Sequence, residues 1–184
     1  MGSVILASLL LKLGGYGFLR FTLTLFPFGC QYHNPMVYGM GLASVLFASL
    51  MTIRQMDMKR IIAYSSVAHM NLIVLGLFSY TKEGIDGAIY LMVGHGIVSS
   101  ALFFLVGILY DRHHTRILLY YGGLVQVMPF YSIFFFLFTM ANMGFPGTSN
   151  FIGELLILVG LFEKNPFVMV LAASGIVFSA IYSI

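Results

Sequence analysis

The sequence predicts an all-α membrane protein, a polytopic helix bundle of about six transmembrane segments with one broken helix, in a single domain over residues 1–184. The first observation is composition: 60% of the 184 residues are hydrophobic and only 8% are charged, whereas a soluble domain carries about 25% charged residues. The second is that the apolar residues form runs of about 20, the length that crosses a membrane. The third is that basic and non-basic connections alternate along the chain.

Six apolar segments meet the length requirement and end at polar or helix-breaking residues. The expected segments are Ser3–Phe26, Val37–Ile53, Ile61–Tyr80, Gly87–Tyr110, the broken Val125–Phe162 and Phe167–Ile184. Proline lacks a backbone N–H and does not continue a regular helix. Helix boundaries are therefore expected at Pro27, Asn34-Pro35 and Asn165-Pro166.

The charged residues lie mostly in the connections and predict an orientation. The second connection, residues 54–60, and the fourth, residues 111–116, each have a surplus of Lys and Arg. The first connection has neither residue, and the third, residues 82–86, is net acidic. Connections rich in Lys and Arg stay on the cytoplasmic or matrix side. Both chain ends are therefore expected on that basic side, if the broken segment crosses once.

Glu154 is the sharpest candidate for a functional residue. It follows Phe145-Pro146-Gly147-Thr148-Ser149-Asn150 inside a stretch that is otherwise apolar. An ionisable group in a membrane is costly and indicates a functional site, and broken helices at membrane depth line cavities or ion pathways. Asn150 or Ser149 is expected to cap the second half-helix, whose N-terminal dipole favours a carboxylate. The pattern indicates movement of ions or protons.

Two further ionisable residues lie deep in the expected segments. Lys12 is about halfway along the first segment, a depth that disfavours a lysine reaching to the surface. Gly14, Gly15 and Gly17 beside it allow close approach of another helix or loosen this one. His95 lies in the fourth segment. Two roles are possible for its imidazole, an interhelical hydrogen bond and the passage of a proton.

Other polar residues give weaker signals. His69 follows Ser65 and Ser66, and we interpret this patch as interhelical hydrogen bonding. Lys59 opens the third segment, where its position alone predicts an orientation determinant and a headgroup contact. One cysteine, Cys30, gives no metal-ligand spacing, and no nucleotide-binding or hydrolase motif is present. The net charge of +3 does not indicate nucleic acid as a partner.

Five motifs follow one another along the chain, at residues 2–21, 57–70, 95–103, 109–116 and 146–154. The last one reads Pro-Gly-Thr-Ser-Asn-Phe-Ile-Gly-Glu. Together they resemble the subunit 4 family of NADH dehydrogenase, which are antiporter-like membrane subunits of respiratory complex I. The resemblance spans nearly the whole chain and is strongest to mitochondrial versions from plants and protists.

This resemblance implies a proton relay. Lys12 matches the relay lysine of the family's eighth helix, and His95 matches the central-axis histidine of the eleventh. Glu154 matches the carboxylate of the broken twelfth helix, which leads the proton path outward, and Lys59 matches a family lysine near the axis. The implied fold is the eighth helix plus the second of two inverted five-helix repeats.

The resemblance also implies a function and partners. The chain would be a multi-pass membrane-arm subunit of proton-pumping NADH:ubiquinone oxidoreductase in the mitochondrial inner membrane, with both termini in the matrix. FMN, iron–sulfur clusters, NADH and ubiquinone are expected in other subunits, with no redox chemistry in this chain. Expected partners are subunits 2 and 5, other membrane subunits, and lipids such as cardiolipin. The alternatives are a subunit of a multi-subunit cation/proton antiporter, or a membrane scaffold that has lost pumping.

In the family, further sequence precedes Gly2 and follows Ile184. We therefore expect either a truncated product or a split gene, in which a separate chain supplies the first half with a membrane-embedded Glu and Lys. The glycine-rich face of the first segment and the patch of Ser65, Ser66 and His69 are expected to need such a partner, because unsatisfied polar groups are costly in lipid.

Overall fold

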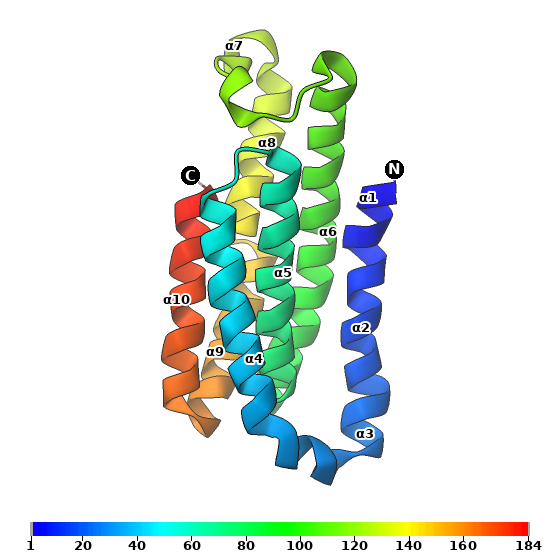
Figure 1. The fold of residues 1–184 in the computed structure, drawn as a ribbon, viewed down its shortest axis with the longest axis vertical. Coiled ribbons are helices and arrows are strands. Elements are labelled where there is room, and N and C mark those ends of the chain that lie inside the picture. Colours follow the sequence, from blue (N-terminus) through cyan, green and yellow to red (C-terminus); the bar gives the residue numbers. More distant parts are fainter. Residues whose placement is uncertain (1, 184) are drawn as a thin grey trace.

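The computed structural model describes residues 2–183, which form a bundle of helices packed side by side (Figure 1). The first membrane-length helix, Gly2–Leu25, consists of α1 (Gly2–Ile5), α2 (Leu11–Gly17) and α3 (Leu23–Leu25), joined by π-helical stretches at Leu6–Leu10 and Phe18–Thr22. It is followed by α4 (Pro27–Ile53), α5 (Met58–Leu77), α6 (Lys82–His113), α7 (Leu124–Val127), α8 (Pro129–Asn142), α9 (Ser149–Lys164) and α10 (Pro166–Ser183).

The predicted all-α membrane bundle is confirmed. The described residues contain five helices that are long and apolar enough to cross a membrane. The predicted break is also present, because α8 ends at Asn142 and α9 begins at Ser149. With 14 and 16 residues, these half-helices are about 21 and 24 Å long, each shorter than a hydrocarbon core of about 30 Å. Ile184, the last residue of the sixth predicted segment, lies outside the described residues.

The boundary predicted at Asn34-Pro35 is wrong. Helix α4 begins at Pro27, and Pro35 lies inside it. Pro27 occupies the first turn, where a missing N–H costs little. Pro35 removes one hydrogen bond from an exposed part of the helix, and an interior proline can kink a helix without ending it. The first turns of α4 lie at an angle to the rest of the helix, leading towards α3 (Figure 1).

Side-chain caps fix the starts of three other helices. Asp57 precedes α5 and accepts a hydrogen bond from the backbone N–H of Lys59 at 3.0 Å. Thr81 precedes α6 and accepts from the N–H of Gly84 at 3.2 Å. Asn165 accepts from the N–H of Phe167 at 3.2 Å beside Pro166, as the predicted boundary there requires. The sequence therefore specifies these three ends locally.

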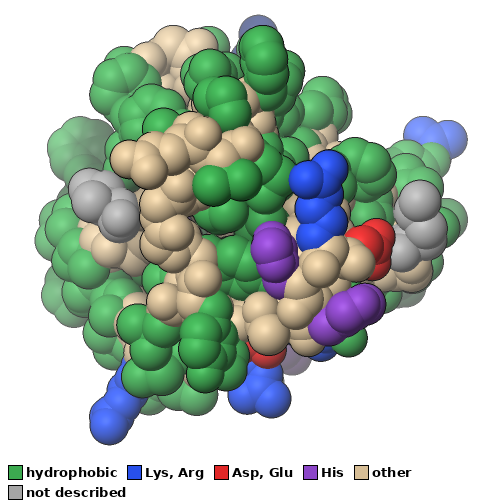
Figure 2. All heavy atoms as spheres, turned by 90° about the horizontal axis from the view of Figure 1, so that it is seen from above, with side chains coloured by type: hydrophobic (Ala, Val, Ile, Leu, Met, Phe, Trp, Pro, Cys, Tyr) green, Lys and Arg blue, Asp and Glu red, His purple; other side chains and the backbone are tan. Residues whose placement is uncertain are grey.

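The connections alternate between the two ends of the bundle, as the charges predict. Figure 1 shows both described chain ends at the same end as the α4–α5 and α6–α7 connections. We call this the basic end, because it carries Arg54, Lys59, Arg60, Arg112 and Arg116. In the view onto this end, Lys, Arg and His side chains lie among apolar ones (Figure 2).

Helices α6 and α9 pack closely at the centre of the bundle because glycines line their interface. A Cβ atom added to Gly87 would lie 2.8 Å from the backbone N of Ile157, and one added to Gly153 would lie 2.9 Å from that of Leu91. Leu91 and Ile157 are fully buried. Small residues let membrane helices approach to backbone contact. This contact fixes the side chains that project from the start of α9 against α6.

Candidate functional site

Four ionisable side chains from four helices lie next to one another inside the bundle. They are Lys12 on α2, His69 on α5, His95 on α6 and Glu154 on α9. His95 is 0% exposed, Glu154 2% and His69 4%, while Lys12 is half-buried. Polar groups removed from water are costly unless they interact with one another. The structure thus joins the three residues predicted from different segments and adds His69.

The Lys12 ammonium contacts the ring of His95. Its Nζ lies 3.0 Å from Nδ1 of His95 and donates to the carbonyl oxygen of Ala7 at 2.5 Å. An ammonium group only donates hydrogen bonds, so Nδ1 accepts while Lys12 is charged, and the ring hydrogen then resides on Nε2. Lys12 therefore faces the interior of the bundle and does not reach towards the membrane surface.

The backbone beside Lys12 is irregular. Ala7 lies in the π-helical stretch Leu6–Leu10, and its carbonyl also accepts a hydrogen bond from Ser99 at 3.4 Å. Short π-helical stretches occur frequently at functional sites. Gly15 is buried where a Cβ would overlap the sulfur of Met92 on α6, whereas Gly14 and Gly17 have open space. The predicted close approach therefore involves one of the three glycines.

His69 links His95 to Glu154. The ring centroids of the two histidines are 5.3 Å apart, and Nδ1 of His69 lies 3.2 Å from Oε1 of Glu154. Oε1 nevertheless has no hydrogen-bond partner among the described side chains. The contact is therefore at ion-pair distance without the alignment of a hydrogen bond, and its attraction depends on a charged His69 facing an ionised Glu154.

The break between α8 and α9 lies against the Glu154 carboxyl group. Gly144 has φ of 73° and Gly147 has φ of 99°, in the left-handed region that favours glycine. A Cβ added to Gly144 would also overlap Oε2 of Glu154. Two constraints, backbone conformation and space for the carboxyl group, therefore require glycine at position 144.

The predicted capping of α9 by Ser149 or Asn150 is wrong. Thr148 precedes the helix and makes no side-chain cap, while Ser149 and Asn150 are its first two residues. Both side chains pack beside Gly94 on α6, where an added Cβ would lie 2.8 Å from each of their oxygens. The close packing of α6 on α9 turns these polar groups towards α6, away from the backbone at the helix start.

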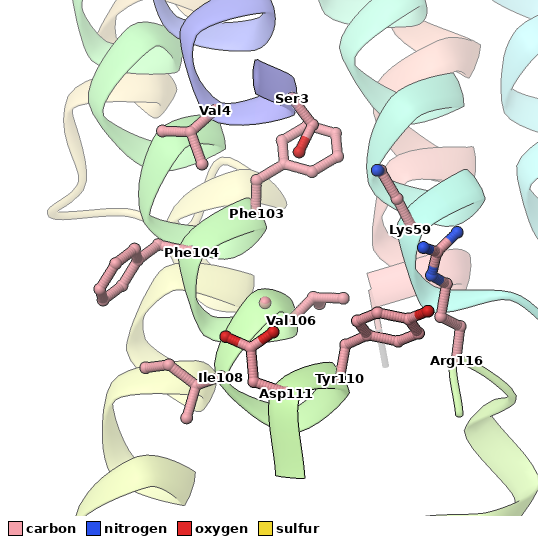
Figure 3. A pocket seen from close by; sticks show the side chains of 11 residues that line it. Ser3, Val4, Lys59, Phe103, Phe104, Val106, Ile108, Tyr110, Asp111 and Arg116 are labelled. Carbon is pink, nitrogen blue, oxygen red and sulfur yellow. The ribbon is translucent and has the colours of Figure 1, made fainter. Parts of the chain in front are cut away.

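Lys59 does not join the other predicted site residues. It precedes His69 by ten residues on α5, which is about 15 Å along the helix. It lines a cavity of about 290 Å³ near the basic end with Ser3, Tyr110, Asp111 and Arg116. Figure 3 shows Lys59 and Arg116 on one side of this cavity, opposite Val4 and Phe103. The Arg116 guanidinium lies 4.4 Å from the centre of the Tyr110 ring.

Sequence reasoning did not assign His69 to the site. The hydroxyls of Ser65 and Ser66 donate to the carbonyl of Ile62, each at 2.9 Å, so they are satisfied within α5. The expectation that the whole patch needs a partner chain was therefore wrong for the two serines. The criterion that selected Lys12, an ionisable residue inside an apolar segment, applies equally to His69 and would have found it.

Metal-ligand clusters are absent from the part of the chain that the structure describes: no three His, Cys, Asp or Glu residues are placed to hold an ion. The site consists of proton-exchanging groups only. Lysine, histidine and carboxylate side chains at these separations can pass protons directly or through one water molecule.

Comparison with known proteins shows the family to which the chain is similar. The family model described as "NADH:quinone oxidoreductase/Mrp antiporter, TM" matches residues 1–179. The NADH-ubiquinone oxidoreductase chain 4 of Marchantia polymorpha is 58% identical over 100% of this chain, which spans 37% of that relative's length. A chain of respiratory complex I from Thermus thermophilus has a TM-score of 0.90 to this chain at 33% identity. The match covers 94% of this chain and 37% of that chain. A chain of an archaeal membrane-bound sulfane sulfur reductase matches with a TM-score of 0.91 at 28% identity, covering 97% of this chain and 37% of its own.

Proposed function

Because the chain belongs to the NADH:quinone oxidoreductase/Mrp antiporter membrane family, we propose that it forms part of the proton-translocating membrane arm of a complex I type NADH:quinone oxidoreductase. The observation that carries the proposal is the contact chain of Lys12, His95, His69 and Glu154 across an apolar bundle. The 58% identity to NADH-ubiquinone oxidoreductase chain 4 supports this function over a cation/proton antiporter.

The proposed relay moves one proton along this contact chain. The Lys12 ammonium releases a proton to Nδ1 of His95, and the ring then releases its other proton from Nε2 towards His69. His69 in turn protonates the Glu154 carboxylate, once its ring turns so that Nδ1–H points along their 3.2 Å contact. In a low-dielectric interior each transfer changes the field at the next group strongly, so charge on one member controls the protonation of its neighbour.

We place Lys59 at the entrance to the relay, outside the contact chain. Ser3 lines the same cavity as Lys59, and Ala7 follows Ser3 by one helical turn. The carbonyl of Ala7 accepts the hydrogen bond from Lys12. The cavity thus ends about one helical turn from the carbonyl that holds Lys12, and we propose that protons enter by it and that the charge of Lys59 sets the electrostatic potential at its mouth.

We assign the redox steps to other subunits. NADH, FMN, iron–sulfur clusters and ubiquinone supply electron transfer there, and the single cysteine in this sequence cannot supply the four thiolates of a cluster. We further propose contacts with subunits 2 and 5 and with anionic lipids such as cardiolipin. The remainder of an antiporter-like subunit, on the same or a separate chain, would cover the first helix, where Leu9, Leu13 and Tyr16 are more than half exposed.

The basic end is expected to face the mitochondrial matrix. A cysteine replacing His113, in a Cys30→Ser background, should react with an impermeant thiol reagent only after the inner membrane is opened. A cysteine replacing Lys82, the first residue of α6 at the opposite end of the bundle, serves as the matched control and should react in intact mitoplasts. Labelling of position 113 in intact mitoplasts would overturn this orientation.

A native purification tests the proposed function. We expect the tagged chain to co-purify with quinone-reducing subunits, and the assembly to couple NADH oxidation to acidification of one side of a proteoliposome. Mass spectrometry identifies the partners. Co-purification with antiporter subunits alone, without NADH oxidation, would instead support the cation/proton antiporter. An assembly that pumps unchanged after loss of Glu154 would support a scaffold.

A further inference from the structure

Two cavities meet at Tyr182 on α10, and the relay described above uses neither. The smaller, about 10 Å³, is lined by polar groups of His69, Glu154, Ser179 and Tyr182 among apolar residues of α4, α5 and α10. The larger, about 200 Å³, also includes Tyr182. Its other polar lining residues are Ser65, Thr139, Asn142 and Ser183. Tyr182 therefore lies between Glu154 and a larger cavity that is lined by both polar and apolar side chains.

The smaller cavity fits one water molecule. Its volume matches that of a single water, which needs two to four polar partners in a buried site. The hydroxyl of Tyr182 and Oε1 of Glu154 are both buried, and neither has a hydrogen-bond partner among the described residues. The hydroxyl of Ser179 donates to Ile176 at 2.7 Å and keeps its acceptor capacity. Three polar groups can therefore coordinate a water here.

The larger cavity extends towards the basic end. Its lining includes Met58, the first residue of α5, and Leu118 in the α6–α7 connection. The backbone N–H of Leu118 donates to the carbonyl of Met56 at 3.0 Å, which places both at the level of the α4–α5 connection. From these apolar residues the lining continues through Ser65 and Thr139 to Asn142 at the helix break. This cavity is distinct from the one that contains Lys59.

We propose that Tyr182 is a proton-relaying residue that holds one water against the Glu154 carboxyl and connects it to the basic end through the larger cavity. The expected effect of Tyr182 on pumping rests on the proposed function, whereas the geometry of the two cavities does not depend on it. The Tyr182 hydroxyl accepts a proton from a cavity water, which takes one in turn from solvent at the basic end, while the hydroxyl donates its own proton to the bridging water. That water gives a proton to the Glu154 carboxylate, so Tyr182 and the water end neutral and unchanged.

This connection gives Glu154 a second proton source. Through His69 it receives protons that entered by way of Lys12, and through Tyr182 it exchanges protons with the basic end directly. A pump with both routes open would let protons return to the side from which they came. The Tyr182 route must therefore be closed while protons arrive through His69 if the assembly is to pump.

The cavity is tested without reference to activity. In the assembled complex with Cys30→Ser, a cysteine replacing Thr139 should react with a charged methanethiosulfonate added at the basic end. A cysteine replacing Phe136, one turn earlier on α8 and 61% exposed on the apolar surface, is the control and should stay unreactive. Equal reactivity of the two cysteines, or none at position 139, would overturn the cavity as a water-filled route.

The role of Tyr182 is tested by removing only its hydroxyl. Tyr182→Phe should abolish the density of a water bridging residue 182 and Glu154 in a high-resolution map, and should lower the pumping rate by severalfold with a changed solvent isotope effect. Tyr131→Phe is the matched control, because it also loses a hydroxyl, one that donates to the carbonyl of Leu105 at 3.3 Å in a part-buried hydrogen bond, and Tyr131 lines neither cavity. Both quantities should remain at wild-type values in that variant.

These measurements separate the possible failures. A wild-type map without the bridging water would overturn the proposal, as would a Tyr182→Phe complex with the pumping rate and isotope effect of Tyr131→Phe. If the wild-type assembly does not pump at all, the proposed function fails. The bridging water and the reactivity at position 139 still decide whether Tyr182 connects Glu154 to the basic end.

Discussion

Replacing Glu154 with glutamine is expected to lower coupled NADH-to-quinone turnover and proton pumping by about tenfold or more, while the complex still assembles. Glutamine keeps the shape and hydrogen-bonding capacity of the side chain but has no proton to exchange. The effect should be large because Glu154 is 2% exposed and contacts both the helix break at Gly144 and the ring of His69. No other carboxylate among the described residues lies within ion-pair distance of that ring.

The matched control is Glu163→Gln on the same helix. Glu163 lies nine residues after Glu154 and is exposed, so its replacement should leave both rates unchanged. Turnover is measured as NADH oxidation with a soluble quinone, pumping as acidification in proteoliposomes, and assembly by native gel. An assembled Glu154→Gln complex with full pumping would exclude this carboxyl group from the relay.

Replacing Lys12 with alanine is expected to impair pumping far more than replacing Arg20 in the same helix. Lys12 contacts Nδ1 of His95 and the carbonyl of Ala7, whereas Arg20 is exposed near the helix end. Alanine removes the first donor of the contact chain, so we expect a loss of about tenfold or more in the coupled rate. Arg20→Ala should stay near wild type in both pumping and assembly.

Lys12→Arg distinguishes positive charge from proton transfer. A guanidinium keeps the charge beside His95 but remains protonated in proteins, so this variant should assemble and still pump poorly. Wild-type pumping by Lys12→Arg would show that Lys12 supplies only charge. Comparable losses from Lys12→Ala and Arg20→Ala, at equal assembly, would show that contact with His95 is not what matters.

The sequence alone determined the class of fold and most of its elements. Uncompensated charge is expensive in lipid, so apolar runs about 20 residues long identify membrane helices with little dependence on tertiary context. The break before Glu154 was predictable because Gly144, Pro146 and Gly147 act on the local backbone. The boundary at Pro35 was wrong because a proline can bend a helix or end it, and the local sequence does not distinguish the two. In the structure Pro35 lies in an exposed part of α4, and the helix continues through it.

The tertiary structure decided which ionisable residues act together. Lys12, His95 and Glu154 were individually conspicuous, but their contacts join residues far apart in the sequence, 83 positions for Lys12 and His95. His69 joined them, and Lys59 proved to lie about 15 Å away along α5. The cavities beside Tyr182 were not foreseeable, because a cavity depends on how side chains of several helices fill space. Hydropathy and local backbone preference act within a segment, whereas proximity between segments is set by packing, here by the glycines that bring α9 against α6.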